Sequence, residues 1–179
     1  SGLQVQLRLP NICVQDVPHL ANKLRNRLIA SLLVLSSYNL SLAPLYRLLD
    51  DANEAATLES RYKLRRQDLK PDRMDFKAAQ RLFDGGLIRH LEQLSQSLAC
   101  QRDRHELFHL TVYLRIGNAV TASYLDPTLH PRKRIELAFF AAAFVEGWFA
   151  DLYSKSGNYK VSVVFITQNA YHSIRLNAT

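Results

Sequence analysis

The chain has 179 residues, of which 47% are hydrophobic and 22% are charged. This hydrophobic share supports a folded core and excludes the composition typical of disordered chains. The formal net charge is +7, which favours anionic partners such as nucleic acids and nucleotides. No apolar run reaches the ~18 residues that a membrane-spanning helix needs. We therefore expect an intracellular protein without a membrane partner.

The N-terminal residues carry a strand pattern followed by a helix pattern. Residues 3–9 alternate between apolar and polar side chains, which predicts a strand ending at Pro10. The apolar run 12–14 predicts a second, short strand. A helix is expected from about Pro18, because proline favours the first helical turn and the leucines that follow share one face. The sequence thus opens with a β-β-α unit.

The rest of the chain is dominated by helical signals. Segment 51–70 is polar and gives no clear prediction, and the glycine pair at 85–86 is expected to stop a helix. Short, proline-containing connections favour antiparallel neighbours, so we predict a mainly α, antiparallel bundle-like domain. The helices are expected at residues 42–50, 74–83, 87–98, 104–125, 131–155 and 167–176.

The second long helix, at 131–155, is apolar nearly all round. A helix of this kind is expected to lie centrally in a fold, with its aromatic side chains in the core. These aromatic residues are Phe139, Phe140, Phe144, Trp148, Phe149 and Tyr153.

One motif spans the junction between the short strand and the first helix. Asp16 leaves the strand and is followed by Pro18, His19 and a helix that carries lysine and arginine. Residues 13–28 resemble the Asp-x-Pro-His-Leu-x-Lys-x-x-Arg-Asn signature of P element and THAP-type DNA transposases. Residues 68–83 resemble a second family segment, with Arg73 in place of a lysine. The order of motifs between 126 and 171 is also similar.

The resemblance implies a DNA-cutting and strand-joining function. In this family, an RNase H-like domain holds acidic residues around two Mg²⁺ ions that activate water or a DNA 3′-hydroxyl. Asp16 matches the second acidic ligand. Residues 1–30 would form an edge of that catalytic domain, and residues 31–179 would be a helical insertion, which binds GTP in the P element branch. The sequence has no glycine-rich phosphate loop to which GTP contacts could be assigned.

Further expectations concern the longer protein and its partners. The other catalytic acids are not identifiable in this chain, so we expect a piece of a nuclear protein that is inactive alone and compatible with a homo-oligomer. Basic residues of two predicted helix starts are candidates for contacts to DNA phosphates. They are Lys23, Arg25, Arg27, Arg132, Lys133 and Arg134. The plainer alternatives are that Asp16 only caps a helix and that the 132–134 trio is only solvated.

A different motif supports an enzymatic alternative. His105, Glu106 and His109 match His-Glu-x-x-His, which on a helix places two zinc ligands and a general base on one face of a metallopeptidase. Glu136 or Glu146 could supply the third ligand. The polar residues 101–104 before the motif argue against it, because catalytic zinc helices are usually buried there, and so does the charge of Asp103, where metallopeptidases prefer an uncharged residue. A third hypothesis is a helical module without chemistry that contacts protein or DNA.

Overall fold

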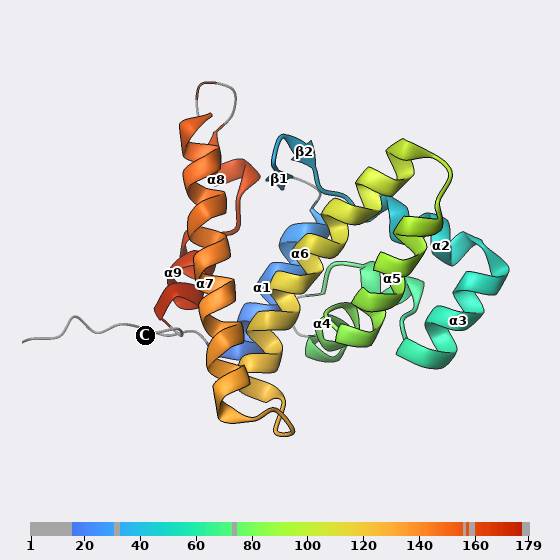
Figure 1. The fold of residues 1–179 in the computed structure, drawn as a ribbon, viewed down its shortest axis with the longest axis horizontal. Helices are drawn as coiled ribbons and strands as arrows, with labels where there is room; N and C mark the ends of the chain where they lie inside the picture. The colour runs from blue at the N-terminus through green and yellow to red at the C-terminus, as the bar shows by residue number, and fades with distance from the viewer. Residues whose placement is uncertain (1–15, 31–32, 73–74, 156, 158–159, 177–179) are drawn as a thin grey trace, which may run out of the picture.

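The computed structural model describes residues 16–30, 33–72, 75–155, 157 and 160–176. These residues form nine α-helices, one 3-10 turn and a two-stranded antiparallel hairpin, which confirms the prediction of a mainly helical chain (Figure 1). The strands predicted at residues 3–14 lie outside the described residues, so the β-β-α unit and its RNase H-like edge stay predictions. No helix of the described part is long and apolar enough to cross a membrane.

Most helices begin and end within a few residues of the predicted bounds. The polar segment without a clear prediction contains a helix, because the Asp51 carboxylate accepts hydrogen bonds from the N–H groups of Asn53 and Glu54 at its start. The helices are α1 (Val17–Ile29), α2 (Ala43–Asp50), α3 (Ala52–Tyr62), α4 (Phe76–Leu82), α5 (Gly85–Ser97), α6 (Gln101–Leu125), α7 (Pro131–Ser154), α8 (Val161–Val164) and α9 (Gln168–Leu176), with the 3-10 turn η1 at Arg66–Leu69.

The glycine pair was expected to stop a helix, but it lies at the start of one, α5. Gly85 and Gly86 form the first turn of that helix, and Asp84 is its N-cap, accepting a hydrogen bond from the Leu87 N–H at 2.9 Å. The cap satisfies a backbone donor that has no partner inside the helix. A strong capping residue therefore outweighs the weak helix propensity of glycine at this position.

The centre of the fold is α6, and not α7 as its aromatic residues had predicted. In Figure 1, α6 (yellow) runs between α7 on one side and α5 on the other, with α1 behind it. Phe139, Phe140 and Tyr153 of α7 are 57%, 46% and 67% exposed. Only one stripe of α7 packs inward, because α6 and α9 cover only one side of it. This stripe contains Ala141, Val145, Trp148 and Leu152.

The first helix is built into the same core as the helical body. Leu20, Leu24 and Leu28 of α1 are fully or almost fully buried and pack against α4, α6 and α9. The buried hydroxyl of Tyr113 on α6 donates to the Leu24 carbonyl at 2.8 Å. Within the described residues, α1 therefore shares its core with the helices that follow it.

A small hairpin links α1 to α2. Strands β1 (Val34–Leu35) and β2 (Tyr38–Asn39) pair antiparallel, and the two-residue loop between them has φ of 48° at Ser36 and 72° at Ser37. Positive φ at both central residues is what a type I′ hairpin turn requires. The Trp148 indole N–H donates to the Val34 carbonyl at 2.7 Å, so the hairpin is tied to α7.

Candidate nucleic-acid and nucleotide sites

Asp16 lies at the N-cap of α1 with its side chain exposed. Its carboxylate makes no capping hydrogen bond, whereas the carboxylates of Asp51 and Asp84 accept bonds from the backbone of their helices. The plainer alternative, in which Asp16 serves as a capping acceptor, therefore has no hydrogen bond to support it. The carboxylate stays accessible to a ligand from solvent.

Arg25 has a structural position in this fold. It is 0% exposed, and it donates to the carbonyl oxygens of Asp68 at 2.9 Å, Lys70 at 2.6 Å and Asp72 at 3.1 Å. Burial lowers the pKa of its guanidinium, while the carboxylates of Asp75, Asp68 and Asp72 oppose that shift. Arg25 thus fastens segment 68–72 to α1, and its buried position is closed to the phosphate contact that the sequence predicted.

The other two basic residues of α1 are half-buried at the surface. Arg27 donates through Nε to the Phe165 carbonyl at 2.8 Å and through Nη2 to the Ser162 carbonyl at 3.1 Å. Within the described part of the chain, neither Lys23 nor Arg27 forms an ion pair with a carboxylate. Arg27 also donates to the Val163 carbonyl at 2.5 Å, so its guanidinium fastens the segment before α9 to α1, and Lys23 is the basic residue of α1 that stays accessible to an anion.

A cavity of about 410 Å³ lies on the exposed side of α1 and reaches the start of α9. Asn22 is only 6% exposed, and its Oδ1 atom is buried and has no hydrogen-bond partner among the described residues. Sequence reasoning did not single out Asn22, although a polar residue between Leu20 and Leu24 on a buried helix was a usable signal. The residues that line the cavity are His19, Asn22, Lys23, Asn26, Arg27, Ala30 and Thr167.

The basic trio at the start of α7 divides into two roles. Arg134 donates to the carbonyl oxygens of Ser123 and Tyr124, each at 2.7 Å, and so caps the C-terminal end of α6. Arg132 and Lys133 are exposed, and both pair with Glu136 at 3.2 Å. Two of the three predicted phosphate ligands therefore face solvent, and one is used within the fold.

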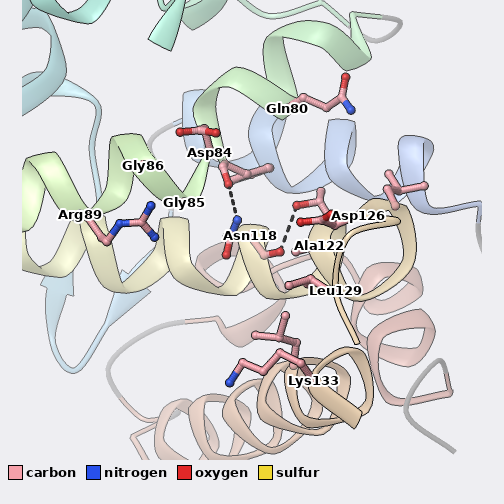
Figure 2. A pocket seen from close by; sticks show the side chains of 14 residues that line it. Gln80, Asp84, Gly85, Gly86, Arg89, Asn118, Ala122, Asp126, Leu129 and Lys133 are labelled. Atoms are coloured by element: carbon pink, nitrogen blue, oxygen red, sulfur yellow. Dashed lines mark hydrogen bonds between the residues drawn. The ribbon is translucent and has the colours of Figure 1, made fainter. Parts of the chain in front are cut away.

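A larger pocket, of about 580 Å³, lies where the start of α5, the C-terminal half of α6 and the start of α7 meet (Figure 2). Its walls carry two cations, Arg89 and Lys133. Asn118 donates from its side chain to the Phe83 carbonyl at 2.8 Å. Hydrogen bonds from Thr128 lower the pKa of Asp126, which keeps that carboxylate an acceptor. The volume suits a nucleotide.

The His-Glu-x-x-His motif lies in the first turns of α6, with all three side chains engaged locally. The His109 ring stacks on Tyr38 at 4.0 Å between ring centroids, and its Nδ1 is 2.7 Å from the His105 carbonyl oxygen. Glu106 accepts hydrogen bonds from Arg47 at 2.8 Å and from Arg102. The bond from Arg47 lowers the pKa of Glu106 most, and the bond from Arg102 lowers it further. Burial of the carboxylate raises the pKa but does not cancel this effect. A paired, more acidic carboxylate is a weaker general base.

The two proposed third ligands have contacts elsewhere in the fold. Glu136 lines a groove together with Arg115 and Ala119 of α6. At about 1.5 Å per residue, these two residues lie roughly 15–20 Å along the helix axis from His105, and so does Glu136. Glu146 accepts a hydrogen bond from the Tyr171 hydroxyl at 2.7 Å. Among the residues that the structure describes, no group of three His, Cys, Asp or Glu side chains could hold a metal ion. The zinc site stays a prediction without an assembled ligand set.

No family model matches the chain, and neither a curated protein nor a solved structure matches it. Inference about function therefore depends on the residues, their geometry and the motif around Asp16. Three features stand out together in the fold: the free carboxylate of Asp16, the α1 cavity and the pocket at the start of α5.

Proposed function

We propose that this chain is part of a transposase-like protein that cuts and joins DNA with Mg²⁺, and that Asp16 is one of the metal ligands. The observation that supports the proposal is the free carboxylate of Asp16 at the start of a firmly packed helix. Burial of the leucine face of α1 fixes the direction of its first turn. The core therefore sets the position of the Asp16 backbone, from which the carboxylate extends into solvent.

The chemistry of Asp16 suits a hard cation. Mg²⁺ prefers carboxylate oxygens and keeps several ligands, so one aspartate is a fitting but insufficient donor. Mg²⁺ bound there would activate water or a DNA 3′-hydroxyl and stabilise charge on the phosphodiester. The proposal requires further acidic ligands besides Asp16. Lys23, on the exposed side of the same helix, would neutralise a DNA phosphate.

The proposal is tested by a DNA-nicking assay on the longest natural form of the protein, with supercoiled plasmid and Mg²⁺. We expect Asp16→Asn to abolish nicking and to leave the unfolding temperature unchanged, since the carboxylate makes no capping bond and no ion pair within the described part of the chain. Asp50→Asn is the matched control, because it removes a surface carboxylate at a helix end that pairs only with Arg66. Retained nicking in Asp16→Asn would contradict the metal role. DNA binding by an inactive wild type would favour the non-catalytic module.

We also propose that the pocket of Figure 2 binds a guanine nucleotide. Arg89 and Lys133 suit the phosphates, and the ionised Asp126 suits the N–H donors of a guanine base. Fluorescence titration with a labelled GTP analogue tests this proposal. Lys133→Ala should weaken binding, and Arg132→Ala, which removes a neighbouring cation outside the pocket, should not. Equal weakening by both variants would point to nonspecific charge, and equal competition by ATP would exclude guanine selectivity.

A further inference from the structure

The outer face of α7 exposes large apolar side chains that no described part of the chain covers. In Figure 1, α7 (orange) lies at one edge of the molecule. Near its start Ile135, Phe139 and Phe140 are exposed, and near its end Tyr153 is exposed. A Cβ atom added at Gly147, between the two groups, would meet nothing within 4 Å. Half of the exposed large hydrophobic residues in the described part of the chain therefore lie on this one helix.

The middle of this helix offers no unpaired charge to a partner. Between residues 137 and 154 it carries two charged side chains, Glu146 and Asp151. Glu146 pairs with Arg175 of α9, and Asp151 pairs with Lys155. A nucleic acid needs unpaired cations on the surface that binds it. An apolar centre with charged residues at its ends is instead the arrangement of a protein–protein interface.

The exposed residues are spaced symmetrically about the middle of α7. Phe139 lies seven residues before Glu146, and Tyr153 lies seven residues after it. Because seven residues are nearly two helical turns, both rings lie on the same side of the helix. The small residues Ala143 and Ala150 lie between them. A twofold axis at the middle of α7 would therefore bring Phe139 of one copy against Tyr153 of an antiparallel second copy, at both ends of the contact.

We propose that the outer face of α7 binds the same face of a second copy of this chain and forms an antiparallel, twofold dimer. With about 200 Å² for each of its four large side chains, the face exposes roughly 400–500 Å² of apolar surface. This equals the largest apolar patch of a typical monomer, which is often functional. Two such faces with their rims would bury about 1,000–1,200 Å² together, at the low end for specific complexes. We therefore expect a dimer that dissociates on dilution.

Sedimentation velocity at protein concentrations from about 1 to 200 μM tests the proposal. The wild type should pass from monomer to dimer over this range. Phe139→Ser and Tyr153→Ser should each weaken association at least about tenfold, since twofold symmetry makes every ring contribute twice. Tyr38→Ser is the matched control, because the exposed Tyr38 ring stacks on His109 of α6 instead. Urea denaturation should show that the Phe139→Ser and Tyr153→Ser monomers are folded.

Cysteine cross-linking tests the antiparallel orientation. Cys13 and Cys100 are first replaced by serine, and oxidation with copper phenanthroline then forms disulfides between copies. Phe139→Cys mixed with Tyr153→Cys should cross-link. Phe139→Cys alone should not, because its two copies would lie about 21 Å apart along the helix axis, beyond the roughly 7 Å that a disulfide spans between Cα atoms.

Several results would overturn the proposal. They are a wild type that stays monomeric at every concentration, an equal loss of association in Tyr38→Ser, and a Phe139→Cys protein that cross-links with itself. The longest natural form of the protein should dimerise as this chain does. If it is monomeric where this chain dimerises, another part of that protein covers α7 and the proposal is wrong. None of these measurements involves Asp16, Mg²⁺ or GTP, so this proposal and the proposed function can fail independently.

Discussion

Two glycines inside the long helices should respond in opposite ways to the same substitution. Gly117 lies within α6, and a Cβ atom added there would be 2.7 Å from Cγ of Phe83 and closer still to two other ring carbons. Gly147 lies within α7, and an added Cβ would meet nothing within 4 Å. Carbon atoms pack favourably at about 3.5–4.0 Å, so only the first site is overfilled.

The expected magnitudes follow from helix propensity and packing. Replacing glycine by alanine in a helix interior contributes about 1 kcal/mol to stability. At position 147 this gain has no opposing effect, so Gly147→Ala should raise the free energy of unfolding by about 0.5–1 kcal/mol. At position 117 the Phe83 ring is 1% exposed and has no room to move. Overpacking costs about 1–3 kcal/mol, so Gly117→Ala should be less stable than wild type by up to about 2 kcal/mol.

Urea denaturation is the assay, followed by circular dichroism and by the fluorescence of the single tryptophan, Trp148. The two variants should differ by about 0.5–3 kcal/mol, with Gly147→Ala the more stable of the two. The double variant Gly117→Ala/Phe83→Leu should be more stable than the sum of its single changes predicts, because the smaller side chain relieves the overlap. A Gly117→Ala protein as stable as wild type would refute the packing argument.

Three further results are expected. Lys63→Gly should stabilise the fold by about 0.5–1 kcal/mol in urea denaturation, because residue 63 ends α3 with φ of 56°; a loss would contradict this. Arg25→Leu should cost about 3 kcal/mol or more by the same assay, since three carbonyls lose their donor; a near-neutral result would argue against its structural role. The bond from Arg47 lowers the pKa of Glu106. This ion pair should contribute at most about 1 kcal/mol to the free energy of unfolding, present above about pH 4.3 and lost as the pH falls further. Glu106→Gln should therefore lose less stability on acidification than the wild type, and an unchanged pH profile would exclude the effect.

The zinc hypothesis has a separate test in the metal content of the purified protein, measured by mass spectrometry without a histidine tag. We expect no tightly held zinc, because Glu106 is paired with two arginines and the described residues contain no group of three His, Cys, Asp or Glu side chains that could hold a metal ion. One zinc per chain that disappears in His105→Ala would establish the hydrolase alternative instead.

Local chemistry explains why many helix bounds could be predicted. The C-terminal end of α6 and the start of α7 follow from Pro127, Pro131 and the polar residues beside them, since proline and capping residues act within one turn. The α3 helix was not predicted, because its apolar face is narrow and Leu58 is its only buried residue. Its start depends on the Asp51 cap, and in a polar segment such a cap cannot be distinguished from other residues that favour turns.

Burial could not be predicted from the same patterns. The aromatic residues of α7 indicated a central helix, yet Phe139, Phe140 and Tyr153 are exposed. The number of neighbours around a helix depends on how all the helices pack, and hydrophobicity alone does not specify it. The same limit applies to Arg25, whose carbonyl partners lie more than forty residues away in sequence.

By itself, the sequence determined the helical class and most helix ends, because these depend on neighbours along the chain, and it carries the Asp16 motif on which the proposed function rests. Only the tertiary structure decided which basic residues stay accessible. It buried Arg25, used Arg134 as a helix cap, bonded Arg27 to the segment before α9 and left Lys23 at the rim of the α1 cavity. Thr167 joined that cavity from the start of α9. A site formed by segments that are distant in sequence depends on how the helices pack, and a local sequence pattern does not specify that packing.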